Sequence, residues 1–588
     1  MNLGSSTRPE RLEDRIAPAG LVSVLYSSAT GTLVLNGDNL DNSVDVFQTG
    51  TDTYQIKGLS GTMLTGSRGP VSILDIGKLS SLTINGNDGA DDFGLTDLTA
   101  LKTLKFDGGA GVDFLIATNL AVKGDVTMNL GADNGLIAFA GASTFIGGDF
   151  KATYGDGGGS VDFFAATTSI KGAVNLNGGN GNDGFSFGGV VKVEKGITIT
   201  DAGMGMSVAF QGATAVIGKG RGGDSIEFSG GSGVDFLKFV GGDISLKGSL
   251  EFEGGAGADI VDLNAVSLKT DGKVVINGGE DSDLIKIAGA KVSLGRGVSL
   301  IGGGGADDVT LSGKQLSIDG SVRLDGGDGD DTLNVLADAL SLSGSLTILG
   351  GGGANVGSTF ADGSIRGDVS FDMAGANGGG NQTFLMGGIS GAVGALAIGG
   401  DLTVKSQAGD TLNHGFSDFF WATDVTVSKS VKITMGAVDS SVSLDNAFIR
   451  GSLSIDTGAG NDTVDIEQNG LGGPSIIGQI ASIQLGEGSD VIRIGKSSAA
   501  GSSDYVIFKG GVQVDGGPGN DLSNDFLSDA ANVFDMTSRG DCHDERGDDR
   551  RGDRHDDYGR GDDDQGKFDR GIVRFIKERL NFEGFLPV

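Results

Sequence analysis

Aspartate is the residue type whose spacing in this sequence most directly suggests chemistry. Five aspartates are separated by intervals of 24 residues: Asp235, Asp259, Asp283, Asp307 and Asp331. A further interval of the same length ends at Asn355. Short glycine-containing stretches precede all five aspartates, so carboxylate and backbone carbonyl oxygens recur together, and these are oxygen types that Ca²⁺ takes as ligands. The spacing indicates a repeated structural unit that presents one carboxylate per repeat.

One carboxylate per repeat creates an electrostatic problem if the repeats stack. At the β-strand spacing of about 4.8 Å, neighbouring carboxylates repel by roughly 0.8 kcal/mol in water and roughly 3 kcal/mol at an effective dielectric of about 20. A bound calcium ion would cancel this repulsion and join the repeats. Alternatively, each aspartate only shapes its own turn by accepting hydrogen bonds from backbone amides, a role that Asn355 fills without charge. Both interpretations stay open.

The residues after each aspartate alternate between apolar and polar. Apolar residues stand two and four positions after the aspartate, as in Leu237 and Phe239, and a polar residue separates them. Further alternating pairs follow at nine and eleven positions in four of the units, and at fifteen and seventeen positions in all five. Period-two alternation is typical of a half-buried strand. Each unit therefore predicts three short β-strands separated by turns, most of which contain glycine.

Three short strands per repeat of roughly 24 residues predict an all-β protein, a parallel β-helix or β-solenoid whose coils fill one continuous core. A sandwich of hairpins would not keep this period through three differently spaced turns. The expected organisation is an export- or sorting-like segment (1–19), a cap or first coils (20–80), a regular solenoid (81–355), an irregular solenoid (356–455), C-terminal coils (456–536), a disordered Arg/Gly/Asp-rich tail (537–570) and a short amphipathic segment (571–588).

Composition narrows the classes of function. The 588 residues include 110 glycines and 6 prolines, and the formal net charge is −34. Such a charge repels nucleic acid, so we expect no nucleic-acid partner, and it favours cations or basic partners. The longest apolar runs are strand-sized, so we expect no membrane span. The single cysteine, Cys542, leaves packing or bound ions to provide stability outside the cell.

The turns before the first strand carry a recognisable motif. They read GGAGVD at 108, GGNGND at 178, GGSGVD at 230, GGAGAD at 254, GGGGAD at 302, GGDGDD at 326 and GGPGND at 516. This pattern resembles the hemolysin-type (RTX) repeat GGxGxDxUx of bacterial surface and secreted proteins, in which glycine carbonyls and the motif aspartate bind calcium. The resemblance implies calcium as the cofactor. It implies as ligands Asp91, Asp113, Asp183, Asp235, Asp259, Asp283, Asp307, Asp331, Asp462, Asp490 and Asp521. The sequence departs from that family in placing one motif, not a tandem series, in each 24-residue coil.

A second candidate site lies in the irregular part of the repeat. The segment 408–425 contains the only tryptophan, Trp421, together with several phenylalanines and the acids Asp410, Asp418 and Asp424. Aromatic rings beside paired carboxylates suit polysaccharide binding or glycoside cleavage. The alternative is that these aromatics fill the core of an irregular coil. No catalytic residue can be assigned from this spacing.

The two ends of the chain bear on location. The stretch RPERLEDRIAPA (8–19) resembles a short N-terminal element of the LEDR-x-x-PA kind, found ahead of the repeats in some large bacterial surface proteins. We therefore expect an extracellular or cell-surface protein of bacteria. The favoured function is a non-enzymatic, calcium-stabilised structural or adhesion rod, with a surface-matrix partner and open β edges that permit self-association. The alternative is a β-helix protein that binds or degrades a polysaccharide.

Overall fold

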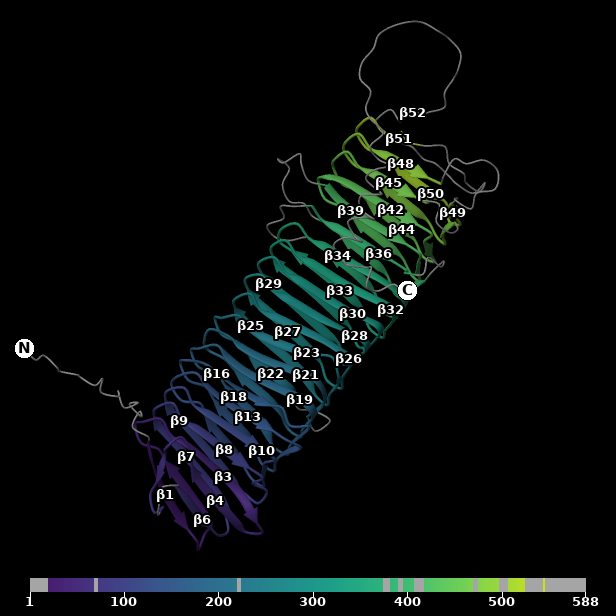
Figure 1. Ribbon diagram of the computed structural model, residues 1–588. Coiled ribbons are helices and arrows are strands. Elements are labelled where there is room, and N and C mark those ends of the chain that lie inside the picture. The colour runs from purple at the N-terminus through teal and green to yellow at the C-terminus, as the bar shows by residue number, and fades with distance from the viewer. Residues whose placement is uncertain are drawn as a thin grey trace, which may run out of the picture. The chain divides into compact units, whose positions relative to one another are not determined.

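A computed structural model gives the structure of the chain (Figure 1). It describes residues 20–67, 72–218, 224–373, 381–389, 395–406, 417–468, 474–495, 506–523 and 543–544. The chain divides into two compact units, Met1–Glu545 and Arg546–Val588, and the second lies outside the described residues. So do the segment 1–19, nearly all of the tail 537–570, and the segment 571–588. No helix among the described residues is long and apolar enough to cross a membrane.

The first unit is a parallel β-solenoid, as the repeat predicts (Figure 1). In the coil that starts at Asp259, β26 (Ile260–Thr270) is followed by β27 (Val274–Glu280). β26 pairs in parallel with β28 (Leu284–Gly295), and β27 pairs in parallel with β29 (Val298–Gly304). In these pairs each residue lies beside the residue 24 positions later, as Val261 does beside Ile285. The period in the sequence is therefore the length of one coil.

Each coil contributes to two sheets. The third strand of every coil, such as β27, belongs to one narrow sheet, and the first and second strands belong to the other, wider sheet. In several central coils the first two predicted strands run on as one, as in β26, β28 and β30 (Asp308–Asp319). In the coil of Asp235 they stay separate as β23 (Phe236–Val240) and β24 (Asp243–Leu246). The middle turn is thus a bend within the wide sheet.

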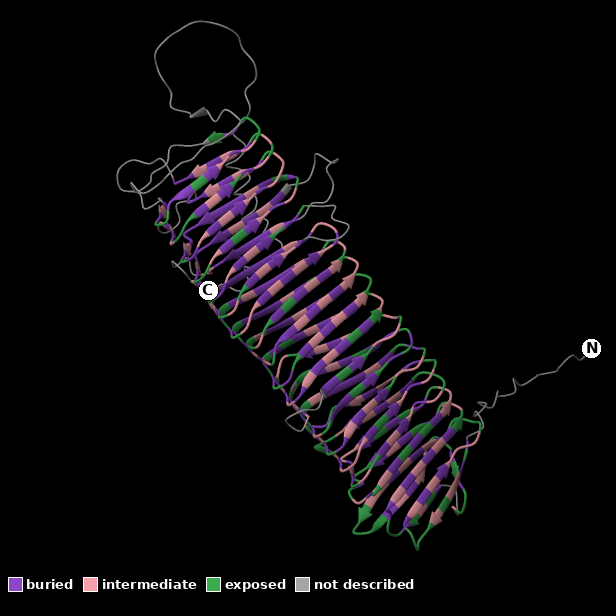
Figure 2. Ribbon diagram, turned by 180° about the vertical axis from the view of Figure 1, so that it is seen from behind, coloured by how far each residue is buried: buried purple, intermediate pink, exposed green. Residues whose placement is uncertain are grey.

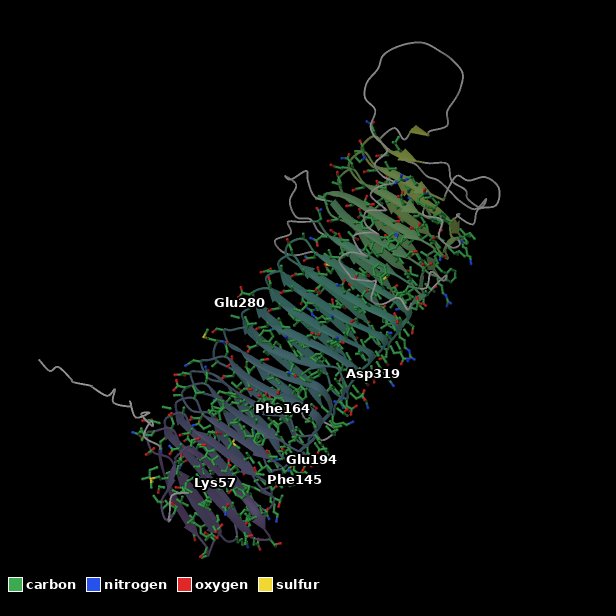
Figure 3. The ribbon with its side chains drawn as sticks, viewed as in Figure 1. Lys57, Phe145, Phe164, Glu194, Glu280 and Asp319 are labelled. Carbon is green, nitrogen blue, oxygen red and sulfur yellow. The ribbon has the colours of Figure 1, made fainter. Side chains whose placement is uncertain are left out.

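Two corners in each coil connect the narrow sheet and the wide sheet. The motif corner is the turn between the narrow sheet and the wide sheet, such as residues 254–258, and it holds the glycine-rich motif. The opposite corner leads from the wide sheet back to the narrow one, as at 271–273. Figure 3 shows Glu280 at the motif corner, and Glu194 and Asp319 at the opposite corner, on two different edges of the solenoid.

The core lies between the two sheets and continues from coil to coil. Along most strands buried residues alternate with intermediate or exposed ones (Figure 2), as in β27. Phenylalanines stack on one another inside the early coils: the ring centroids of Phe139 and Phe163 lie 4.4 Å apart, and those of Phe163 and Phe187 lie 5.0 Å apart. Burying one such side chain contributes about 1.5–3 kcal/mol. A coil gains this energy only when neighbouring coils cover it.

The first residues of the solenoid depart from the parallel pattern. β1 (Leu21–Ser27) pairs antiparallel with β2 (Thr32–Asn36), and β3 (Ser43–Gly50) pairs antiparallel with β4 (Thr53–Gly58). β2 and β3 then start the two parallel sheets by pairing with β7 (Ser81–Asp88) and β8 (Asp92–Thr96).

The later coils keep the same register although the sequence period changes. β34 (Val356–Ile365) pairs with β36 (Thr383–Gly387), and β36 pairs with β39 (Ser417–Thr423). In these pairs Val356 lies beside Thr383, and Thr383 lies beside Phe419. The longer steps reflect insertions in the turns. The stack of coils itself is not interrupted where the period in the sequence blurs.

Candidate functional site: the buried aspartate column

The eleven aspartates predicted as ligands all lie at the motif corner, where the first strand of their coils begins. Their exposed fractions range from 0% to 4%, so all are buried. We call the residues at this position in successive coils the aspartate column. The side chains point inward at the edge of the core, and the acids that face solvent at this corner belong to the turns beside them.

The column is tied together by hydrogen bonds between coils. The backbone N–H of Asp235 donates to Oδ1 of Asp259 over 2.7 Å, and the same bond joins Asp259 to Asp283 and Asp283 to Asp307 at 2.7 Å each. The N–H of Asp307 donates to Oδ1 of Asp331 at 3.0 Å. Each carboxylate therefore accepts a hydrogen bond from the column residue of the preceding coil, which satisfies a buried backbone amide at the corner.

Three further column residues, Asn42, Gln382 and Asp418, were not predicted from the sequence, whereas Asn355 stands on the 24-residue interval. The N–H of Asp331 donates to Oδ1 of Asn355 (2.9 Å), that of Asn355 to Oε1 of Gln382 (3.3 Å), and that of Gln382 to Oδ1 of Asp418 (3.0 Å). Asn42 begins the column by donating to Asp91. The alternation in the sequence could have identified Gln382 and Asp418, because apolar residues stand two and four positions after each of them. These apolar residues are buried in the structure.

The column is not continuous over all eleven aspartates. Glycines occupy its position in two consecutive coils, at Gly135 and Gly159, so Asp113 and Asp183 are not linked by side-chain bonds. Met206 occupies the position after Asp183, and Ser440 the position before Asp462. The bonded runs are therefore Asn42 to Asp113, Met206 to Asp418, and Ser440 to Asp521.

The second carboxylate oxygen explains the first glycine of the motif. Oδ2 of Asp307 is buried and has no hydrogen-bond partner among the described residues, and the same holds for Oδ2 of eight other column aspartates. A Cβ added at Gly302 would lie 2.2 Å from Oδ2 of Asp307. The first glycine therefore leaves room for the carboxylate. The second glycine, Gly303, is needed for another reason, because its φ is 122°.

Burial changes the acidity of the column. Desolvation raises the pKa of Asp259 and Asp283 to about 7 from the ordinary value of 3.8, and neighbouring aspartates add to the rise. The hydrogen bond from the preceding coil lowers the pKa but does not offset the burial. Burial also raises the pKa of Asp91, Asp183, Asp331 and Asp462 to about 7, and that of Asp113, Asp235 and Asp490 to about 6.

Asn355 shows how a neutral side chain at the column position makes the hydrogen bonds of the motif corner. Its Oδ1 accepts the hydrogen bond from Asp331, as an aspartate would, and its Nδ2 donates to the carbonyl oxygen of Gly352 over 3.1 Å. A protonated aspartate carries a donor at the corresponding oxygen. The motif corner therefore accommodates a neutral, hydrogen-bonding column residue without a cation.

The oxygens beside the column define what a cation would find there. Oδ2 of Asp259 and the carbonyl oxygen of Gly278 lie 2.0 and 2.2 Å from the position that a Cβ of Gly254 would take. One unpaired carboxylate oxygen and one carbonyl oxygen thus approach each other, whereas Ca²⁺ takes about six to eight oxygens. Among the described residues, no group of three or more His, Cys, Asp or Glu side chains is placed to hold a metal ion. Calcium binding by the eleven aspartates stays a prediction.

The structure describes only part of the aromatic segment 408–425. Asp410, His414 and Phe416 lie outside the described residues. Phe420 is buried in the core, and Asp418 belongs to the column. Trp421 is half-buried, and its Nε1–H donates to Oδ2 of Asp445 over 3.4 Å.

The acids near Trp421 are also buried. Asp424 and Asp445 are 6% and 1% exposed, and Asp424 accepts a hydrogen bond from Nδ2 of Asn446. The described carboxylates of this segment therefore take part in the packing of the coils, and none of them is presented on the surface beside the ring of Trp421.

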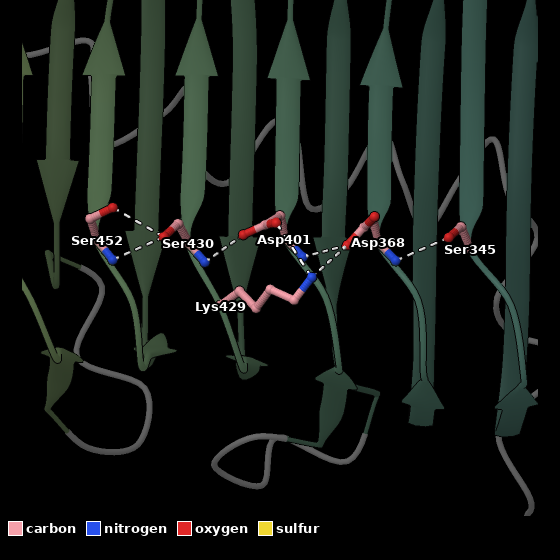
Figure 4. A network of polar contacts seen from close by, with 6 residues as sticks. All are labelled: Ser345, Asp368, Asp401, Lys429, Ser430 and Ser452. Carbon is pink, nitrogen blue, oxygen red and sulfur yellow. Dashed lines mark hydrogen bonds and ion pairs between the residues drawn. The ribbon is translucent and has the colours of Figure 1, made fainter.

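A second ladder of side-chain bonds runs along the opposite corner (Figure 4). The N–H of Asp401 donates to Oδ1 of Asp368, and the N–H of Ser430 donates to Oδ1 of Asp401, both over 2.9 Å. Lys429 Nζ lies 3.7 Å from carboxylate oxygens of both aspartates. Here each acceptor belongs to the earlier coil, which is the reverse of the aspartate column. The two corners thus hold the coils together by ladders of opposite direction.

The fold and the column define a β-solenoid repeat protein, compatible with a structural or a polysaccharide-related role. In comparisons with known proteins, no family model, no curated protein and no solved structure matches the chain.

Proposed function

We propose that the chain is a non-enzymatic structural rod in which the aspartate column ties the coils into one cooperative stack. The observation that carries this proposal is the unbroken run of hydrogen bonds from Met206 to Asp418, in which nearly every column side chain is an acceptor. A continuous apolar core and two corner ladders suit a molecule that resists extension and local unfolding. A catalytic role would require reactive groups that reach solvent, and the column carboxylates are buried.

Calcium enters this proposal as an ion for which the unpaired Oδ2 atoms are candidate ligands. A buried acceptor without a partner costs about 1–3 kcal/mol, so a partner that reaches Oδ2 stabilises the folded chain. Two partners are chemically suitable: a proton, which the raised pKa values favour, and a calcium ion, which the resemblance to the hemolysin-type repeat implies. They differ in their dependence on pH, because a proton is lost above pH 7 whereas calcium binding requires the ionised carboxylate.

Thermal unfolding of the whole chain, followed by circular dichroism, separates the two partners. The melting temperature is measured at pH 5 and pH 8 with calcium, with magnesium and with chelator, at matched ionic strength. A rise at pH 8 that depends on calcium concentration and is not reproduced by magnesium supports calcium. Identical curves at pH 8, together with a higher melting temperature at pH 5, leave the structural rod in place and assign Oδ2 to the proton.

The column variant Asp283→Asn serves as the matched control. Asn keeps the acceptor for the N–H of Asp259 and removes the charge, as Asn355 does naturally in its own coil. With calcium bound at the column, this variant lowers the melting temperature at pH 8 in calcium. With protons as the only partner, the same variant raises it. Multiple unfolding transitions under all conditions would argue against a single cooperative rod.

The location at the bacterial cell surface is part of the same proposal. Its support is the resemblance of residues 8–19 to an N-terminal element of surface proteins and the near absence of cysteine. Digestion of intact cells by added protease provides the test. Loss of the full-length chain while a cytosolic marker survives supports surface exposure, and survival of the chain until the cells are lysed would contradict it.

A further inference from the structure

The two corners of the solenoid carry opposite charge. The described motif-corner turns contain no lysine or arginine. Ten acids there are exposed: Asp41, Asp88, Asp133, Asp156, Glu280, Asp281, Asp328, Asp330, Asp439 and Glu487. No ion pair with a described residue involves any of the ten. Because these turns lie above one another, the acids form a row parallel to the axis of the coils, which we call the acidic edge.

The opposite corner holds twelve described lysines and arginines in a chain whose net charge is −34. The described lysines and arginines at this corner are Lys78, Lys102, Lys123, Lys171, Lys195, Lys247, Lys273, Arg296, Arg366, Lys429, Arg450 and Lys509. Seven acids share the corner, and some neutralise these cations, as Glu194 does Lys171 at 2.5 Å. Lys102, Lys123, Lys273 and Arg296 are exposed and form no ion pair with a described residue. We call this row the basic edge.

The two edges match in geometry as well as in charge. Both corners are turns of the same coils, so positions along either edge are spaced by the same rise of about 4.8 Å per coil. A second copy of the chain therefore offers an acidic edge in step with the basic edge of the first over many coils. At physiological ionic strength charges interact over about 8 Å, so the facing edges decide the contact and more distant like charges are screened.

We propose that copies of this chain associate side by side, with the acidic edge of one against the basic edge of the next. The contact joins two different surfaces, so it does not close on itself, and each added copy presents both edges again. A single exposed ion pair contributes little, and the contact depends on the row as a whole. The proposal concerns the partner of the structural rod and is independent of what occupies Oδ2 in the column.

Charge reversal on each edge tests the proposal. The basic-edge variant combines Lys102→Glu, Lys123→Glu, Lys273→Glu and Arg296→Glu. The acidic-edge variant combines Asp88→Lys, Glu280→Lys, Asp328→Lys and Glu487→Lys, four exposed acids whose side chains form no hydrogen bond with a described residue. A face control carries the same change of charge as the basic-edge variant, but on the outer faces of the sheets: Lys105→Glu, Lys151→Glu, Lys291→Glu and Lys432→Glu.

Sedimentation velocity of the whole chain, with chelator present, measures the association at about 0.1 M and about 1 M salt, where the Debye length falls from about 10 Å to about 3 Å. We expect the unaltered chain and the face control to form larger species at low salt that disperse at high salt. Each edge variant alone should stay monomeric. An equimolar mixture of the two edge variants should associate again, because the acidic edge of one then faces the basic edge of the other.

Several results would overturn the proposal. The first is an unaltered chain that stays monomeric at low salt at every concentration. The second is an edge variant that associates as the face control does. The third is a basic edge that binds an anionic polysaccharide while the chain itself stays monomeric, which would assign the edge to a different partner. Circular dichroism melting curves verify that the variants fold, so a failure of edge pairing is distinguished from a failure of the rod itself.

Discussion

The backbone N–H of Asp259 donates a 2.7 Å hydrogen bond to Oδ1 of Asp283, the residue that occupies the same place in the next coil. The carboxylate that looks like a metal ligand in the sequence is thus first of all a partner for a buried amide. Its other oxygen, Oδ2, is buried and finds no described partner. Asp283 accepts the hydrogen bond that the buried amide of Asp259 needs, but one of its own oxygens has no described partner. The stability of the solenoid therefore depends on pH and on the residues around the motif.

Removal of the Asp283 carboxylate should separate its two roles. Both Asp283→Ala and Asp283→Asn remove the buried charge, but only Ala leaves the N–H of Asp259 without its acceptor, so we expect the Ala variant to be less stable than the Asn variant by about 1–3 kcal/mol. In the absence of calcium, Asp283→Asn keeps the acceptor and should stabilise the chain at pH 8 by about 1–3 kcal/mol, because no charge is then buried. Urea unfolding at pH 8 with chelator measures both. Equal destabilisation by Ala and Asn would contradict this account.

The column should make the chain less stable as the pH rises from about 4 to about 7. Folding raises the pKa of Asp259, Asp283 and Asp331 from 3.8 to about 7, so the folded state binds more protons than the unfolded state across this window. Stability from these groups is fully present below pH 4 and is lost as the pH passes 7. Urea unfolding with chelator, in steps of pH, provides the measurement. A free energy of unfolding that rises from pH 5 to pH 8 would refute the assignment.

Three consecutive glycines of one motif should respond differently to alanine. Gly302→Ala places a Cβ 2.2 Å from Oδ2 of Asp307, and Gly303→Ala demands a φ of 122° and a contact of 2.0 Å with the carbonyl oxygen of Gly279. We expect each to cost about 1–3 kcal/mol. Gly304→Ala meets nothing within 4 Å and should change the unfolding free energy by less than about 0.5 kcal/mol.

The coupling between Gly302 and Asp307 gives this prediction a second readout. If the clash with Oδ2 is the cause, the double variant Gly302→Ala/Asp307→Ala should be less destabilised than the sum of the single variants. Thermal or urea unfolding of the four chains completes the cycle. Strict additivity would show that the first glycine is required for some reason other than the carboxylate.

The ladder at the opposite corner should depend on its backbone bonds more than on its ion pairs. Asp401→Ala removes the acceptor of the Ser430 N–H at 2.9 Å, and we expect a loss of about 1–2 kcal/mol. Lys429→Met removes two ion pairs of 3.7 Å at an exposed site and should cost less than about 0.5 kcal/mol. Urea unfolding compares the two. A larger effect of Lys429→Met would assign the strength of this corner to charge.

Repetition makes the solenoid predictable from the order of the residues. The 24-residue interval and the alternation after each aspartate predict parallel stacked strands, and the pairing of β26 with β28 confirms them at that offset. The same alternation extends to Gln382 and Asp418, yet insertions in the turns move them off the period. By its spacing, Asp418 instead suggests an acid of a carbohydrate site. The alternation alone is enough to identify these two column positions. The spacing points away from them, because turns tolerate insertions that stacked strands do not.

The sequence by itself determined the coil, because alternating side chains on a short strand can be buried only against copies of the same strand. It could not determine what the aspartates contact. Whether Oδ1 meets an amide, a cation or solvent depends on the register of the next coil, 24 residues away, and on the space left by the first glycine. The burial of the column, the opposite directions of the two ladders and the separation of charge onto two edges arise only when the coils are stacked. Tertiary structure decides them because each is a relation between coils and not a property of any one repeat.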